Sequence, residues 1–128
     1  MEETRSPGLK HRHYSPEAEV IVVEGTVSAM IDQVQRLVNT CKQRNLKVGV
    51  LAADETTTKY EADVVKSFGK REELTVIAKN LFRLLREFDL ERVDVIIAES
   101  VSTRGLGLAV MNRLHKASGY KIVKASDN

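Results

Sequence analysis

Residues 19–53 read EVIVVEGTVSAMIDQVQRLVNTCKQRNLKVGVLAA, and two short apolar runs stand at the ends of this stretch. The runs at 20–23 and 48–53 contain no polar side chain, which is typical of strands that are covered on both faces. Between them, apolar residues recur at spacings of three and four and predict a helix with one apolar stripe: Val27, Met30, Ile31, Val34, Leu37, Val38 and Cys41. A strand, a helix and a second strand in this order predict a right-handed βαβ unit and hence a parallel sheet.

The same alternation continues along the rest of the chain. Four further elements are predicted, namely a strand over 62–68, a helix over 74–88, a strand over 93–98 and a helix over 105–118. The last helix has Leu108, Met111 and Leu114 as its apolar positions and Gly119 as its C-terminal glycine. Residues 120–124 suit a fifth, edge strand, and the polar residues 54–60 suit one or two helical turns. The sequence therefore predicts an α/β fold, a Rossmann-like three-layer sandwich with a parallel sheet of four to five strands.

An irregular segment precedes this pattern. Residues 1–18 contain both prolines of the protein, Pro7 and Pro16, and show neither a helical nor a strand period. Proline fixes its own φ and biases the preceding residue toward extended conformations. We therefore expect an extended N-terminal arm over residues 1–18 and a separate folded domain over residues 19–128.

The composition is that of a single soluble domain. The chain has 128 residues, of which 42% are hydrophobic and 30% charged, and its 20 basic and 18 acidic residues give a net charge of +2. This near balance does not favour direct nucleic-acid binding, which usually requires a larger basic excess on one face. One cysteine, Cys41, excludes an internal disulfide, and it lies on an apolar helix stripe as a core residue. With no signal peptide and no apolar run of bilayer length, we expect a cytoplasmic protein that does not bind membranes.

The loops that follow the strands are the places where a parallel sheet binds ligands. The turn at residues 24–28 lacks the glycines of a dinucleotide-binding motif, and the chain has no P-loop. The loop after the fourth strand leads through Arg104 into Gly105 and Gly107 at a helix start, where free backbone N–H groups favour an anion. These three residues fit a phosphate contact, but a lone G-x-G is a weak signal, and packing or an interdomain contact is the favoured explanation of the two glycines. Asn112 and Arg113 follow on the same helix, where a solvated face is the alternative to ligand contact.

The arm is locally basic and aromatic. His11 and His13 would point the same way in an extended segment, but His115 is the only other histidine, so a metal site is not predicted. Lys10, Arg12 and Tyr14 suit contact with a phosphate or a base, and a solvated arm is the alternative. Ser100 and Ser102 lack a nucleophile elbow, and the paired acids at 54–55 suit a helix cap. No hydrolytic site is predicted.

Two long motifs then point to a family. Residues 6–16, S-P-G-L-K-H-R-H-Y-S-P, resemble the interdomain linker of two-domain threonylcarbamoyl-AMP synthases, which reads approximately S-P-G-M-K-Y-R-H-Y-(A/S)-P. Leu9 stands in place of the usual methionine and His11 in place of a common tyrosine. Residues 105–114, G-L-G-L-A-V-M-N-R-L, resemble the family signature G-L-G-L-A-I-M-N-R-L. Shorter matches at 62–65, 78–82 and 93–99 follow the family pattern in the same order.

The resemblance implies that this chain is the linker and C-terminal domain of such an enzyme, without its catalytic domain. The full enzyme condenses L-threonine, bicarbonate and ATP into threonylcarbamoyl-adenylate for the t6A modification of tRNA, with ATP and Mg held by the N-terminal catalytic domain. That domain, in cis or in trans, is the implied partner. By position, Arg12, His13 and Tyr14, with Lys10, would contact ATP or the adenylate as a lid. No role is carried over to His11, where the family commonly has tyrosine.

This resemblance predicts a regulatory, lid-bearing domain that is not an enzyme by itself and holds no cofactor of its own. A free-standing nucleotide- or phosphate-binding module that uses Arg104, Gly105 and Gly107 is the alternative. A purely structural interaction domain is a third interpretation. An adenylate-forming site must exclude water, because acyl-adenylates hydrolyse readily, and a lid provides that exclusion.

Overall fold

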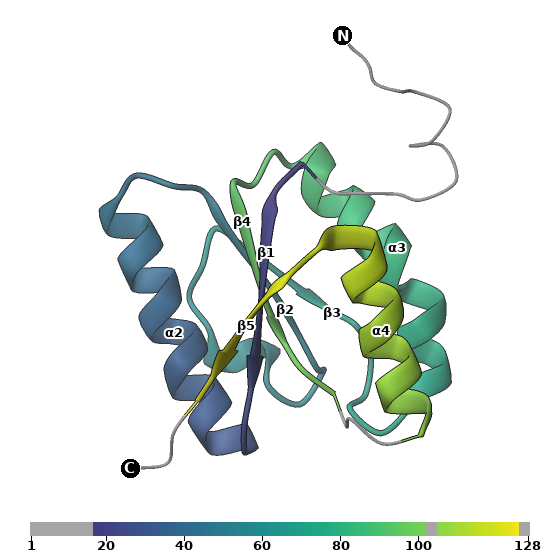
Figure 1. Cartoon of the computed structure of the whole chain (residues 1–128). Helices are drawn as coiled ribbons and strands as arrows, with labels where there is room; N and C mark the ends of the chain where they lie inside the picture. The colour runs from purple at the N-terminus through teal and green to yellow at the C-terminus, as the bar shows by residue number, and fades with distance from the viewer. Residues whose placement is uncertain (1–16, 102–104, 126–128) are drawn as a thin grey trace, which may run out of the picture.

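A computed structural model describes residues 17–101 and 105–125 of the chain. Within these ranges the chain forms five strands, three α-helices and one 3-10 turn (Figure 1). In chain order the elements are β1 (Glu19–Glu24), α2 (Val27–Gln43), β2 (Val48–Ala52), η1 (Thr57–Lys59), β3 (Val64–Ser67), α3 (Leu74–Leu90), β4 (Val95–Glu99), α4 (Leu106–Ser118) and β5 (Lys121–Lys124). The predicted order of strands and helices is confirmed, whereas residues 1–16 of the predicted arm lie outside the described ranges.

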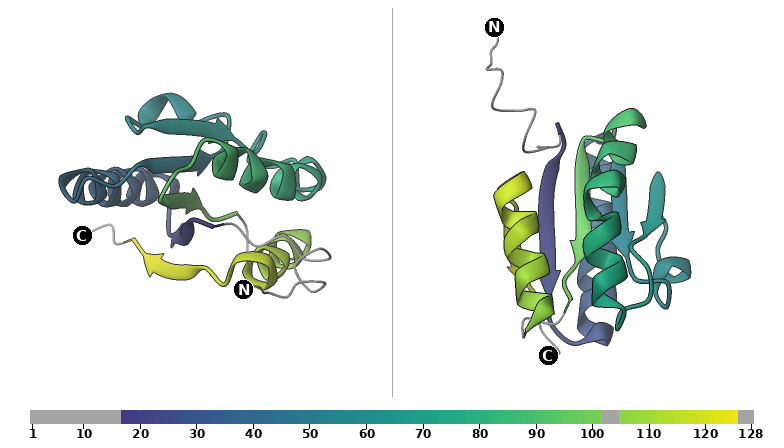
Figure 2. Two further views of the ribbon diagram at one scale, coloured as in Figure 1. Left: turned by 90° about the horizontal axis from the view of Figure 1, so that it is seen from above. Right: turned by 90° about the vertical axis from the view of Figure 1, so that its right-hand side faces the viewer.

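The five strands form one parallel sheet in the order β3-β2-β4-β1-β5. β1 and β4 are direct neighbours, with Val20 opposite Ile96 and Val22 opposite Ala98. Helix α2 covers one face of the sheet, and α3 and α4 cover the other (Figure 2). The Rossmann-like three-layer sandwich is therefore confirmed, and its sheet has five strands.

The core consists of two apolar layers, one on each side of the sheet. The inner strands β2 and β4 are buried along their whole length, which explains the apolar sequences of β2 and of residues 95–98. Ile96 packs toward α3 and α4 with Phe88, whereas the next residue, Ile97, packs toward α2 with Met30. The approach of α3 to the sheet is close, because a Cβ added at Gly49 would lie 2.4 Å from Cε1 of Phe88.

The helix ends follow local sequence signals. The hydroxyl of Thr26 accepts a hydrogen bond from the Ala29 N–H at 3.2 Å and caps the start of α2. Gly119 ends α4 with φ 60° and ψ 37°, so its role as C-terminal glycine is confirmed. The turns after α2 and α3 instead use Asn45 (φ 62°) and Arg92 (φ 60°), side-chain-bearing residues in the left-handed region.

Two predictions differ from the structure in detail. The strand predicted over 62–68 spans only Val64–Ser67 as β3, and its residues are half-buried because it lies at the edge of the sheet. Leu108 was predicted to face the core but is 47% exposed, and Val110 is buried instead, at 4%. The apolar face of α4 includes Gly107, which periodicity does not count as apolar. No helix within the described ranges has both the length and the apolar character needed to cross a membrane.

Candidate functional site

The carboxyl ends of β1 and β4 form a topological switch point. β1 continues into α2 on one face of the sheet, whereas β4 continues toward α4 on the opposite face. The two strand ends remain joined, because the Ser100 N–H donates to the Val23 carbonyl at 3.0 Å. In open α/β sheets this is where ligands bind. The turn at Gly25 and Thr26, Ser100 directly after β4 and the start of α4 therefore border the candidate site.

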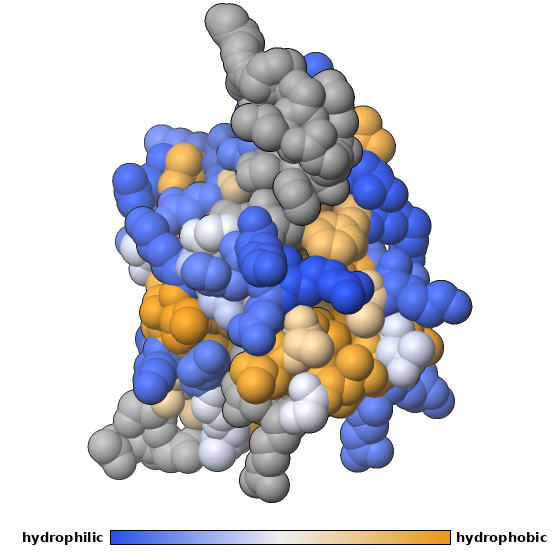
Figure 3. Space-filling model, turned by 45° about the vertical axis from the view of Figure 1, so that its right-hand side comes forward, coloured by the Kyte–Doolittle hydropathy of each residue, from blue (hydrophilic) through white to orange (hydrophobic). Residues whose placement is uncertain are grey.

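The start of α4 contains the glycines that the sequence singled out. Gly105 is exposed with φ 54°, and a Cβ there would meet no heavy atom within 4 Å, so its conformation rather than lack of space favours glycine. Gly107 is buried, while Leu106 and Leu108 are each 47% exposed. Figure 3 shows apolar side chains gathered on the lower part of the α3–α4 face, the end at which α4 begins. Arg104 lies outside the described residues.

Of the other predicted site residues, Asn112 and Arg113 lie within the described ranges. Both lie on exposed positions of α4. Lys10, Arg12, His13 and Tyr14 lie outside the described residues, as does His11. In the part of the chain that the structure describes, no group of three His, Cys, Asp or Glu side chains could hold a metal ion.

A buried carboxylate lies at the end of β4, and sequence reasoning missed it. The side chain of Glu99 has no exposed surface. Its Oε1 accepts hydrogen bonds from the Ala53 N–H at 3.1 Å, from Thr56 Oγ1 at 2.9 Å and from Arg71 Nη2 at 2.5 Å. Its Oε2 accepts a hydrogen bond from the hydroxyl of Tyr60. Four groups from two loops thus meet one carboxylate at the carboxyl end of the central strand.

The electrostatics of this cluster indicate a structural role. Burial, followed by the hydrogen bond to Glu99, raises the pKa of the Tyr60 phenol well above its usual value, so Tyr60 stays a donor. Arg71 compensates the buried negative charge and also approaches the Ser100 carbonyl at 3.5 Å. Because both carboxylate oxygens are occupied by donors, Glu99 is poorly placed to accept a proton from a ligand. The cluster holds the η1 loop and the β3–α3 loop against the end of β4.

One signal in the sequence was available for this cluster. Glu99 directly follows the apolar run at 93–98 and belongs to β4, so a charged residue stands at the end of a strand that is buried throughout. A buried carboxylate requires hydrogen-bond donors from the protein. The sequence gives no indication of which donors these are.

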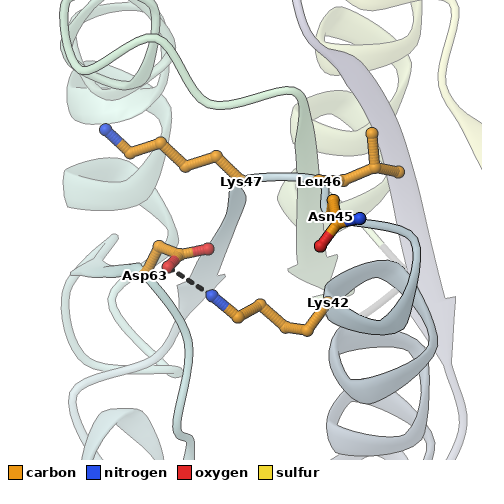
Figure 4. Close-up of a pocket in the computed structure, with 5 residues that line it drawn as sticks. All are labelled: Lys42, Asn45, Leu46, Lys47 and Asp63. Carbon is orange, nitrogen blue, oxygen red and sulfur yellow. Dashed lines mark hydrogen bonds and ion pairs between the residues drawn. The ribbon is translucent and has the colours of Figure 1, made fainter.

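A shallow polar pocket of about 490 Å³ lies at the opposite, amino-terminal edge of the sheet. It is lined by Lys42, Asn45, Leu46, Lys47 and Asp63 (Figure 4). Lys42 Nζ and Asp63 Oδ1 form an ion pair at 2.5 Å, and Asp63 also accepts the Val48 N–H at 2.8 Å. Its charged groups therefore already have partners within the protein, and it is remote from the switch point.

The doubly wound sheet, its switch point and the missing dinucleotide glycines define a Rossmann-like domain without the usual cofactor loop. The chain belongs to the family described as "Threonylcarbamoyl-AMP synthase, C-terminal domain", whose profile matches residues 1–119. It is 48% identical over 124 residues to the threonylcarbamoyl-AMP synthase of Pyrococcus abyssi, covering 97% of this chain and 35% of that protein. The Bacillus subtilis synthase is 43% identical, with 93% of this chain and 33% of that protein covered.

Solved structures agree with this assignment. Pyrococcus abyssi Sua5 in complex with L-threonine superposes with a TM-score of 0.77 at 47% identity, covering 98% of this chain and 35% of that chain. The C-terminal Sua5 domain from Pyrococcus horikoshii gives a TM-score of 0.72 at 49% identity, covering 87% of this chain and all of that one. A Pyrococcus abyssi variant, with a consecutive histidine and tyrosine replaced by alanine, gives 0.77 at 46% identity, covering 88% of this chain and 31% of that chain. This chain thus spans about a third of the length of its curated relatives.

Proposed function

We propose that this chain is the lid-bearing, regulatory domain of a threonylcarbamoyl-AMP synthase. The observation that supports this most directly is that the family match begins at residue 1 and so includes the arm as well as the folded domain. The arm and the Rossmann-like domain therefore occur together in this family. In the proposal, a catalytic domain supplies the chemistry, and this chain supplies the segment that closes over it.

The chemistry of the arm suits that role. Arg12 offers a planar, permanently charged group for phosphate oxygens, and Tyr14 offers an aromatic face for a base. His13–Tyr14 is the only His-Tyr pair in the chain, and the Pyrococcus abyssi variant replaces a consecutive histidine and tyrosine. Lys10 adds a further cation. We propose that these four residues contact ATP or threonylcarbamoyl-adenylate and help to exclude water from it.

The proposal also divides the work between the two domains. ATP with its Mg, threonine and bicarbonate are proposed to bind the catalytic domain, whose product serves t6A modification of tRNA. A relative's crystal structure in complex with L-threonine accords with the substrate. This chain alone is proposed to have no synthase activity, to bind no nucleic acid directly and to act in the cytoplasm with its catalytic domain as partner.

A chimera tests the proposal. Residues 1–128 replace the aligned C-terminal third of the Pyrococcus abyssi synthase, and pyrophosphate release is measured with ATP, threonine and bicarbonate. We expect Arg12→Ala and Tyr14→Ala to lower kcat/KM at least about tenfold, corresponding to a loss of about 1.4 kcal/mol of transition-state stabilisation. Arg36→Ala, which removes an exposed arginine bonded to Gln33 on α2, is the matched control and should have no effect.

Two results would contradict this proposal. Arm variants as active as the parent chimera would reduce residues 1–16 to a passive connection. Calorimetric binding of ATP by the isolated chain, abolished by Arg104→Ala, would instead support the nucleotide-binding alternative at Gly105 and Gly107.

A further inference from the structure

We infer that the amino-terminal edge of the sheet is the surface on which the preceding domain of the enzyme docks. The surface, called here the amino-edge surface, consists of the turn after α2, with Asn45 and Lys47, and of the end of α3 and the turn after it, with Leu90 and Arg92. The inference rests on the proposed function only in taking the preceding domain to be the catalytic one. It places the docking partner at the end of the sheet opposite the switch point.

The first argument is where the chain enters the fold. The Glu17 N–H donates to both carboxylate oxygens of Asp89, at 3.1 and 3.3 Å, and the Glu19 N–H donates to the Asp94 carbonyl at 3.1 Å. Figure 1 shows β1 beginning beside the end of α3. Because this is a C-terminal domain in its family, the rest of a full-length relative precedes it and joins at this point. A domain that docks close to its own junction orders the shortest length of connecting chain.

The second argument is what surrounds this entry point. Leu90 directly follows the anchoring Asp89 and is 81% exposed, the highest value among the large hydrophobic residues described. Two residues later, Arg92 is exposed and has a φ of 60°. An arginine in the left-handed region is unfavourable, and glycine is the usual residue there. Among the described residues no partner binds the guanidinium of Arg92. An exposed apolar side chain and a cation with no partner among the described residues therefore lie beside the junction.

The third argument is that this edge is held rigid. The Asp94 N–H donates to the Lys47 carbonyl at 2.7 Å, and the Lys47 N–H donates to Asp94 Oδ2 at 2.8 Å. Lys47 Nζ also donates to the Glu91 carbonyl at 2.5 Å. The turn after α2 and the turn after α3 are thus bonded to each other, next to the shallow pocket of Figure 4. A surface that is already ordered loses little entropy on binding.

These features define the chemistry of the partner. The docking face should carry an apolar depression for Leu90 and a carboxylate for Arg92. The rival surface is the exposed pair Leu106 and Leu108 at the start of α4. This rival surface lies about 20 Å from the amino-edge surface, because a six-residue strand of that length separates the two edges of the sheet. An extended segment of residues 1–16 spans about 50 Å, so its reach alone does not separate the two surfaces, and the experiment compares them.

Hydrogen–deuterium exchange on the chimera described above, compared with the isolated chain, tests the inference. We expect amide exchange over residues 44–47 and 89–94 to slow at least about tenfold in the chimera, with residues 105–109 unchanged. Leu90→Asp and Arg92→Gly should restore fast exchange at the amino-edge surface. Leu108→Asp is the control, because it makes the same chemical change at a leucine of the opposite edge that is 47% exposed, against 81% for Leu90. It should leave exchange at the amino-edge surface unchanged.

A second format needs no covalent junction. The preceding part of the Pyrococcus abyssi synthase is titrated with residues 1–128 as a separate chain, and Leu90→Asp should weaken binding at least about tenfold. Slowed exchange confined to residues 105–109, or equal exchange at both edges, would overturn the inference. Pyrophosphate release by the same chimera separates the two proposals. An active chimera without protection at the amino edge refutes the docking surface alone, and an inactive but protected one refutes the lid function alone.

Discussion

Replacing Tyr60 by phenylalanine tests whether the Glu99 cluster stabilises this fold. The variant keeps the buried ring and removes only the hydroxyl that donates to Oε2 of Glu99. No other described group donates to that oxygen, and the Glu99 side chain has no exposed surface. The carboxylate therefore loses a hydrogen bond that water cannot easily replace.

The expected loss follows from the charge of the acceptor. A hydrogen bond to a charged group contributes about 1.5–3 kcal/mol, so we expect Tyr60→Phe to lower the free energy of unfolding by about 2 kcal/mol. With a urea dependence of about 1.5 kcal/mol per molar, the unfolding midpoint should fall by about 1.3 M. Circular dichroism at 222 nm follows the transition.

The matched control is Tyr120→Phe. It makes the same chemical change at a half-buried tyrosine whose hydroxyl has no hydrogen bond among the described residues. Its effect should stay within about 0.5 kcal/mol. A Tyr60→Phe variant as stable as the Tyr120→Phe variant would refute the reasoning that the Glu99 oxygens need all their donors.

The same tyrosine makes a prediction about alkaline pH. Because the folded-state pKa of Tyr60 is raised above the unfolded value, the folded protein keeps this proton where the unfolded chain loses it. The contribution is fully present below pH of about 10, the ordinary tyrosine pKa, and is lost as pH rises beyond it. Urea midpoints measured between pH 9 and 11 should fall less steeply for Tyr60→Phe than for the parent.

Three further changes test other parts of the structure. The hydrogen bond from Lys42, and then one from a backbone N–H, lower the pKa of Asp63. Its contribution to stability is therefore present above pH of about 4 and is lost as the pH falls below that value. Asp63→Asn should flatten the acid limb of a stability-versus-pH curve and lower the free energy of unfolding by up to about 1 kcal/mol near neutrality. Gly49→Ala should destabilise the fold by about 1–3 kcal/mol, because the new methyl would overlap the ring of Phe88, and a Gly49→Ala/Phe88→Leu double variant should recover part of that loss in the same urea assay. Arg92→Gly should raise the free energy of unfolding by about 0.5–1 kcal/mol by relieving the left-handed strain, measured by thermal unfolding; a fall in stability would show that the arginine side chain stabilises the isolated domain.

Edges and helix faces mark the limits of what local patterns predict. The apolar runs in β2 and β4 predicted two-sided burial correctly, because inner parallel strands have helices on both faces. The strand predicted over 62–68 contains Asp63, Lys66 and Ser67 among its apolar residues, and β3 is a half-buried edge strand. In α4, Leu108 lies three residues before Met111 and Val110 lies four before Leu114, so both fit a helical stripe by spacing. Only contact with α3 and the sheet buries Val110 rather than Leu108. Periodicity identifies the side chains that share one face of a helix or strand. It does not identify which neighbouring element covers that face.

The sequence by itself determined the α/β class, the order of strands and helices and the family, because each of these depends on local periodicity or on contiguous motifs such as residues 6–16 and 105–114. The strand order and the Glu99 cluster came only from the tertiary structure. Tyr60 and Arg71 are separated from Glu99 by 39 and 28 residues, and nothing in the intervening pattern pairs them. They meet because β2 lies beside β4 in the sheet, which brings the loops after β2 and β3 to the same carboxyl edge, where a buried charge requires every donor within reach.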